Sequence, residues 1–145
     1  MYTTTTVAGV MLMLAGLFAQ QPAAPAKAAP ATLNYDFFKT QVEPIFLKKR
    51  PGHARCIACH GQGTPLRLQA LPAGRTTWTD EESRKNFETI QRVVAPGNVT
   101  SKLLLHPLRE DAGGDFFHSG GKHFTSQNDP EWLTLKAWVM GQTAK

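Results

Sequence analysis

Cys56–His60 reads CIACH, a pair of cysteines separated by two residues and followed at once by a histidine. Two intervening residues let one turn of chain bring both thiols to the same flat group, and the histidine is then held against its centre. This spacing is the attachment motif of c-type haem. The thiols add across the two vinyl groups of the haem, and the imidazole becomes the proximal ligand of the iron.

Other interpretations of the two cysteines explain less. A thioredoxin-type pair would follow a strand and open a helix. Here a helical pattern precedes the pair, and the glycine-rich residues 61–63 follow it. A disulfide would not need His60, and a zinc site lacks its second cysteine pair because the chain has only two cysteines. We therefore predict one covalent haem c on Cys56 and Cys59, with His60 as the proximal iron ligand.

An export signal is predicted at the N-terminus. Residues 7–19 read VAGVMLMLAGLFA, an apolar run that suits a signal peptide and is too short to span a membrane comfortably. We expect residues 1–19 to be a signal peptide cleaved within residues 19–24, and an uncleaved membrane anchor is the alternative. The predicted location is periplasmic or otherwise extracytoplasmic, in a bacterium.

Residues 20–32 are rich in Ala and Pro and form a predicted linker, which leaves residues 33–145 as one folded domain. The net charge of +5 is uneven. Residues 33–75 hold seven Lys/Arg and two Asp/Glu, and residues 76–145 hold eight and nine. A basic half favours an acidic redox protein as partner. Nucleic acid is not expected, because the basic residues are not interleaved with aromatic ones.

Three helices are predicted. Residues 35–49 have apolar side chains at helical spacing and are followed by a Pro-Gly pair. Residues 79–82 read TDEE, a capping box that opens a second helix, which ends at the next Pro-Gly pair, residues 96–97. Residues 129–131 read DPE and open the third, with Asp as N-cap. The apolar positions of these helices are Phe38, Val42, Ile45, Phe46, Phe87, Ile90, Val93, Val94, Trp132, Leu135, Trp138 and Val139.

Two long segments between these helices look irregular, residues 61–78 and 107–128, and residues 101–106 form a candidate short helix. The order of helix, C-x-x-C-H, loop, middle helix and aromatic final helix resembles the monohaem cytochrome c fold. The finer resemblance is to the cytochrome c-like modules of planctomycete and acidobacterial proteins, through CHGQGTPLRLQ from Cys59, VAPGNVTSKLLL from Val94 and WLTLKAWV from Trp132. It implies a mostly α, loop-rich domain wrapped around one haem.

The resemblance also implies a distal iron ligand, commonly a Met on the loop before the last helix. The only Met after the export signal, Met140, falls inside that helix, where a core or surface role is expected. The equivalent loop reads DFFHSGGKHF, and its His118 is the predicted distal ligand. His123 and His106 are the alternatives, and an open site is a further one.

Four further residues are candidates for contacts with the haem. Leu66 and Leu68 could pack on the haem edge, although ordinary core leucines would look the same. Arg67 and Trp78 could donate hydrogen bonds to the haem propionates.

The predicted function is electron transfer, with both axial positions of the iron filled and no catalytic cluster, so the protein is not expected to be an enzyme. Two alternatives stay open. One is a haem-based sensor or enzyme with an open or labile distal site. The other is a membrane-anchored haem subunit of a larger redox complex.

Overall fold

The structure is a computed structural model, and it describes Met1 and residues 31–144. The expected signal peptide, residues 1–19, lies outside the described residues apart from Met1, as do residues 20–30 of the expected linker. The described helices are α1 (Tyr35–Phe37), α2 (Glu43–Leu47), α3 (Cys56–His60), α4 (Asp80–Gln91), α5 (Lys102–Leu105) and α6 (Pro130–Val139), with a π-helical segment η1 (Phe38–Val42) and a 3-10 turn η2 (Glu110–Ala112).

The first predicted helix is one continuous rod of α1, η1 and α2 that ends at Leu47. Asn34 caps its start, with its side-chain oxygen 2.7 Å from the backbone nitrogen of Phe37. Pro44 has no N–H to donate to the carbonyl four residues earlier. The helix widens into the π-helical turn η1 just before Pro44. The backbone N–H of Glu43 donates to the carbonyl of Phe38, five residues earlier.

Both predicted helix starts in the second half of the chain are confirmed. Thr79 accepts from the Glu82 backbone nitrogen at 3.3 Å, and Glu82 accepts in return from the Thr79 nitrogen at 2.8 Å. Asp129 accepts from the first backbone nitrogens of α6. The end of α4 comes earlier than predicted, at Gln91, so Val93 and Val94 lie beyond the helix.

The core is built around the aromatic final helix, whose predicted apolar stripe is buried. Trp138 is fully buried with its ring centroid 5.6 Å from that of Phe38, and its indole nitrogen donates to the Asn34 carbonyl at 2.8 Å. Trp132 donates to the Leu104 carbonyl at 3.0 Å. Each indole thus buries a large apolar surface and still satisfies its polar N–H.

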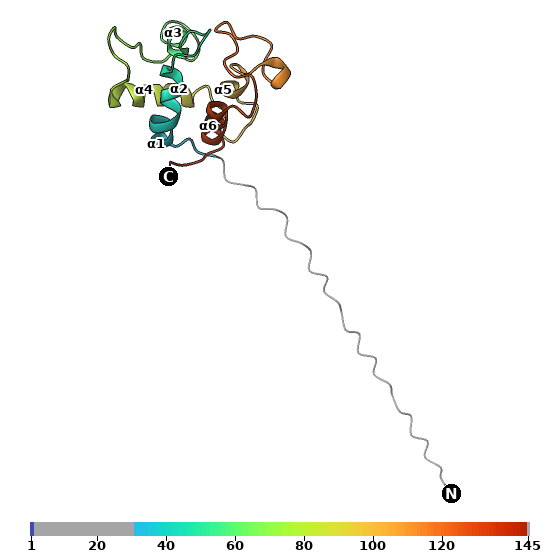
Figure 1. Cartoon of the computed structure of the whole chain (residues 1–145). Coiled ribbons are helices and arrows are strands. Elements are labelled where there is room, and N and C mark those ends of the chain that lie inside the picture. Colours follow the sequence, from blue (N-terminus) through green and yellow to red (C-terminus); the bar gives the residue numbers. More distant parts are fainter. Residues whose placement is uncertain (2–30, 145) are drawn as a thin grey trace.

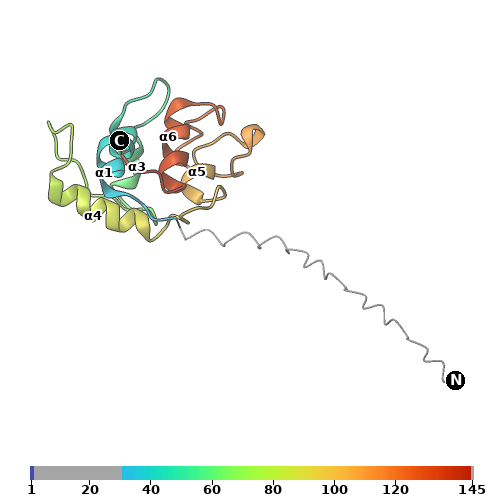
Figure 2. The ribbon, with the colours of Figure 1, turned by 90° about the horizontal axis from the view of Figure 1, so that it is seen from below.

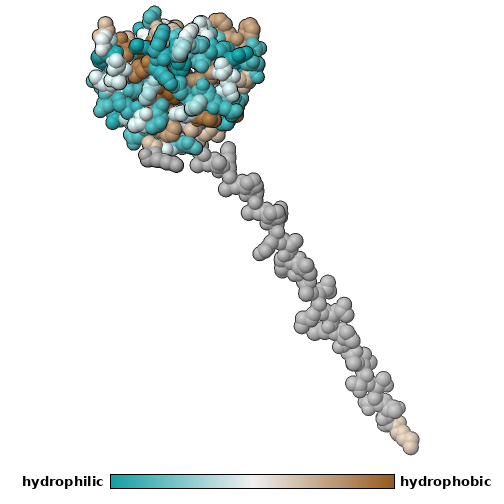
Figure 3. Space-filling model, viewed as in Figure 1, coloured by the Kyte–Doolittle hydropathy of each residue, from teal (hydrophilic) through white to brown (hydrophobic). Residues whose placement is uncertain are grey.

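Figures 1 and 2 show how the helices are arranged. The rod of α1, η1 and α2 runs through the middle of the domain, α6 packs against η1 and α5, and α3 lies at the end far from the chain termini. The two ends of the folded part meet: a side chain on Gly141 would come within 3.1 Å of Ala31. The face drawn in Figure 3 is mostly hydrophilic, as expected for a small domain with a closed core.

Residues 31–144 contain no β-strand, only an isolated parallel bridge between Leu108 and Phe124. The expected mostly α class with long irregular connections is therefore confirmed. None of the helices in this part of the chain is long and apolar enough to cross a membrane.

Candidate functional site

The turn α3 places three reactive side chains on one side. Residues three and four apart share a face of a helix, so Cys56 lies beside Cys59 and His60, whereas Ile57 points into the core and is buried. Both cysteines are free thiols. Gly61 follows the turn, and a larger residue would not fit there without a shift, because a Cβ would lie only 2.8 Å from the Ile57 carbonyl oxygen.

His60 has a fixed tautomer. Its Nδ1 lies 2.9 Å from the carbonyl oxygen of Leu66 and 2.9 Å from the hydroxyl of Thr64, which itself donates to Leu66. Because a carbonyl only accepts, Nδ1 carries the proton and the lone pair remains on Nε2. Burial lowers the pKa of His60, which keeps the ring neutral. A neutral imidazole oriented through its Nδ1–H is the form that binds a metal.

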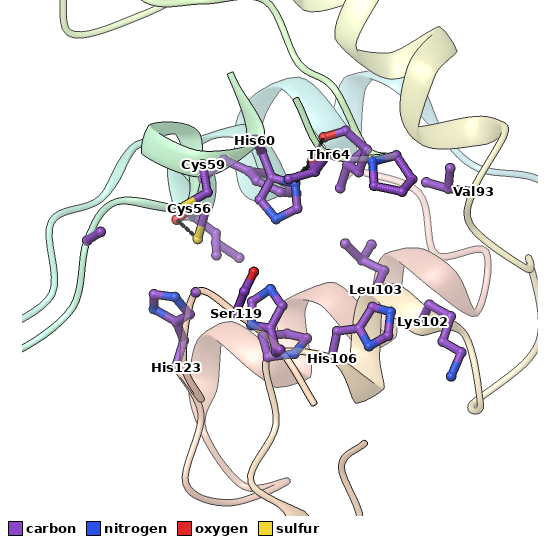
Figure 4. A pocket seen from close by; sticks show the side chains of 18 of the residues that line it. Cys56, Cys59, His60, Thr64, Val93, Lys102, Leu103, His106, Ser119 and His123 are labelled. Carbon is purple, nitrogen blue, oxygen red and sulfur yellow. Dashed lines mark hydrogen bonds between the residues drawn. The ribbon is translucent and has the colours of Figure 1, made fainter. Parts of the chain in front are cut away.

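These side chains open into a cavity of about 420 Å³. Figure 4 shows Cys56, Cys59 and His60 along one wall and His106 and His123 along the other. The walls are otherwise mostly apolar, with contributions from Ile45, Phe46, Leu66, Val93, Leu103 and Leu135.

The opposite wall carries His118, which is oriented in the same way as His60. Its Nδ1 lies 2.7 Å from the carbonyl oxygen of Gly121, so Nδ1 carries a proton and Nε2 stays outside this hydrogen bond. Gly121 has φ +81°, a left-handed conformation that glycine adopts without strain. The Gly120-Gly121 pair therefore shapes a tight turn that returns a carbonyl to the imidazole.

The rings of His60 and His118 lie at a separation that suits one shared metal. Their ring centroids are 6.2 Å apart, and the ring planes are inclined by 25°. Two imidazoles on opposite sides of one metal ion, with metal–nitrogen bonds of about 2.0–2.1 Å, place their centroids roughly 6 Å apart.

The other histidines gather around the same wall. The His118 centroid lies 6.0 Å from that of His106 and 6.2 Å from that of His123, and His123 lies 4.7 Å from His53. All five histidines of the chain are thus within one cluster. Burial lowers the pKa of His123 to about 4, helped by the neighbouring His53, so this ring is neutral at pH 7.

His106 and His123 are held differently from His118. His106 Nδ1 is 2.5 Å from an Asp115 carboxylate oxygen without the alignment of a hydrogen bond. His123 Nδ1 is buried with no hydrogen-bond partner in the described part of the chain. Neither Nδ1 is therefore held by a backbone carbonyl as that of His118 is, although a backbone hydrogen bond to Gly120 acts on the His123 ring.

The predicted haem contacts divide between the cavity and its surroundings. Leu66 lines the cavity. Leu68, Arg67 and Trp78 do not line it. The Leu68 backbone nitrogen donates to the His60 carbonyl at 2.7 Å, and the Leu68 side chain is buried in the core. Arg67 is exposed. Trp78 is buried and donates to Gln69, which fixes the loop.

Two further residues lie outside the cavity wall. Met140 follows the last residue of α6 and is 42% exposed. The amine of Lys122 donates to the carbonyl oxygens of His106 and Asp115, so it braces the loop.

Sequence reasoning missed the role of Arg50, which is 8% exposed beside the cavity wall. It donates to Glu131 and to the Ile45 carbonyl, lies 3.7 Å from the Cys56 sulfur, and packs over the Phe124 ring at 5.3 Å. Burial raises the pKa of the Cys56 thiol although Arg50 opposes this. The only sequence signal was a basic residue directly before the Pro-Gly pair.

Comparison with protein-family models, curated proteins and solved structures finds no match for this chain. Among the described residues, no three His, Cys, Asp or Glu side chains are grouped so as to hold a metal ion by themselves.

The donor set can be tested against haem on chemistry alone. A macrocycle supplies the equatorial ligands of its iron, so the protein needs only axial ligands, apolar walls and, for covalent attachment, thiols. The cavity provides free Nε2 atoms on facing walls, apolar side chains between them and two thiols on one edge. These residues fit a covalently attached haem.

Proposed function

We propose that this protein is an electron carrier with one haem c, bound covalently by Cys56 and Cys59. The C-x-x-C-H spacing is the main support, because few other chemistries need two cysteines and a histidine in this order. Further support comes from the placement of both thiols on the edge of an apolar cavity. In this proposal the domain is a monohaem cytochrome c domain that wraps around the haem.

The axial ligands in this proposal are His60 and His118. The observation that carries the choice is the matched orientation of the two rings, each with its Nδ1 hydrogen-bonded to a backbone carbonyl and its Nε2 unused. The Nδ1 atoms of His106 and His123 have no hydrogen-bond partner in the described part of the chain. They are therefore the less suitable distal ligands.

Haem bound there supplies a one-electron couple between ferric and ferrous iron. The chain contributes orientation and exclusion of water. Leu66 and Thr64 hold His60, Gly121 holds His118, and the apolar walls keep solvent from the centre. Two imidazole ligands favour ferric iron more than an imidazole and a thioether would, so the reduction potential should lie below that of His/Met cytochromes.

The test is a spectrum of the protein purified after export in a host with a working haem-attachment system. We expect haem that stays with the polypeptide through denaturation and acid-organic extraction, and a low-spin ferric electron paramagnetic resonance signal. Extractable haem would contradict the attachment. A colourless protein would instead support a thiol-disulfide module without haem.

The proposed location is outside the cytoplasm, because the N-terminal run has the length and composition of a signal peptide. Mass spectrometry should find the mature chain beginning within residues 20–25. An intact Met1 would support the alternative of a membrane-anchored haem subunit.

One observation favours a second candidate, a haem-based sensor or enzyme. His106 and His123 both flank His118 on the distal wall. If His118 left the iron, either ring could donate to a bound diatomic ligand. Rapid carbon monoxide binding to the reduced wild-type protein would support this candidate over the electron carrier.

A further inference from the structure

A second concavity lies on the outer side of α3. It has a volume of about 700 Å³ and lies between the turn of Ile57, Ala58 and Gly61 and the loop of residues 70–75. These α3 residues face away from Cys56, Cys59 and His60, so the groove is separate from the cavity on the other side of the turn.

The outer rim of the groove is a tight turn. The Arg75 nitrogen donates to the Pro72 carbonyl at 3.1 Å, and Gly74 has φ +82°. A positive φ at the third position is what a type II turn requires. Leu71, Pro72 and Ala73 are thereby held opposite α3 as an apolar surface.

The groove is basic. Lys49, Arg55 and Arg75 line it, and none of its lining residues is acidic. Arg75 pairs with Glu82, whereas Lys49 and Arg55 have no carboxylate within 4 Å in the described part of the chain.

Three other cations of the basic half differ from these two. Lys39, Lys48 and Arg50 are each paired with a carboxylate of the same domain. Arg67 is exposed outside the groove and has no such pair in the described part of the chain. The groove therefore holds two of the three cations of residues 33–75 that no carboxylate pairs, and it holds them beside exposed apolar surface.

We propose that this groove, defined by Lys49, Arg55, Ala58 and the turn 72–75, docks an acidic segment of a partner protein with apolar side chains between its carboxylates. Charge complementarity selects the carboxylates, and the apolar turn selects the side chains between them. A concave site favours a protein segment over a flat membrane surface, which could not enter the groove.

The groove also adjoins the cavity, since Ala54 and Arg55 line both. A partner docked here would lie against the outer side of the turn that carries the two thiols. Electron exchange with such a partner rests on the proposed function. Docking of the partner in the groove does not depend on it.

The test measures binding of a fluorescent peptide of alternating Glu and Leu to the exported full-length protein, by anisotropy at low and high salt. The same peptide with Gln in place of Glu is the neutral control. Lys49→Glu is the informative variant, because Lys49 lines the groove and not the cavity. Arg92→Glu is its match, with the same charge change at an exposed cation that follows the last residue of α4 and does not line the groove.

We expect Lys49→Glu to weaken binding of the acidic peptide roughly tenfold and Arg92→Glu to change it less than twofold. High salt should weaken binding, because at 1 M ionic strength the Debye length is only about 3 Å and the charges of peptide and groove are screened from each other. Carbodiimide coupling should join the Lys49 amine to a peptide carboxylate.

Equal losses in the two variants would overturn the groove, because net charge alone would then explain binding. Absence of peptide binding at low salt would also overturn it. Lys49-dependent binding to phosphatidylglycerol vesicles without peptide binding would assign the surface to a membrane instead. Haem content, read from the absorption spectrum of each sample, reports the proposed function separately.

Discussion

Arg50 Nε lies 3.0 Å from the Glu131 carboxylate, and this pair joins the segment before Cys56 to the first turn of α6. Lys48 adds a second contact to the same carboxylate at 2.6 Å. Since Arg50 also packs over Phe124, one buried guanidinium connects the wall that carries the thiols with the wall that carries His118 and His123.

Glu131→Gln should therefore destabilise the fold. It leaves the Arg50 charge buried without its partner, and we expect a loss of about 1–3 kcal/mol in the free energy of unfolding by urea. Glu81→Gln is the control. It breaks an exposed pair with Lys85, which solvent screens, so the loss of stability should be much smaller. Equal losses would mean that the Arg50 pair has no special role.

The same pair predicts a dependence on pH. Burial raises the pKa of Glu131, but the hydrogen bonds from Lys48 and Arg50 outweigh it, and the net pKa is lowered. A lowered carboxyl pKa stabilises the fold above the unfolded value of about 4.3. The stability gap between wild type and Glu131→Gln should be constant at neutral pH and shrink as the pH falls below this value. A gap that persists at lower pH would contradict the assignment.

His118→Ala should open the proposed distal site. The iron should become high-spin or water-ligated in the ferric state, and the reduced protein should bind carbon monoxide. His106→Ala and His123→Ala are the matched controls and should stay low-spin, and His118→Met should raise the reduction potential. If one of the controls loses the low-spin spectrum while His118→Ala keeps it, that other histidine is the ligand. If all three stay low-spin, Met140 or Lys122 becomes the candidate.

Gly121→Ala tests how His118 is held. A Cβ at Gly121 meets nothing closer than 3.8 Å, so the strain comes only from φ +81°, at about 1–2 kcal/mol. Relief of that strain should move the carbonyl off His118 Nδ1 and admit some carbon monoxide. Gly63→Ala is the control, since its added Cβ would meet open space. Unchanged spectra in both variants would show that the Gly121 carbonyl does not orient the ligand.

Local signals predicted most of the helices. The capping residues Thr79 and Asp129 act within one turn of their own position, so their partners are fixed by spacing along the chain. The helix ends were less accurate, because Val93 and Val94 have the apolar character of the helix although they lie beyond it. The π-helical turn was missed, since its cause is a single proline, Pro44, within a good helical pattern.

The sequence by itself determined the mostly α class, the helix starts and the grouping of Cys56, Cys59 and His60, since these depend on neighbours a few residues apart. Only the tertiary structure decided which groups meet across the cavity. Residues 60 and 118, or 50 and 131, come together through loops whose paths no local pattern specifies. For the same reason the Gly121 carbonyl on His118 and the uncompensated charge of Lys49 and Arg55 could not be predicted: both depend on where the folded chain places, or fails to place, a partner.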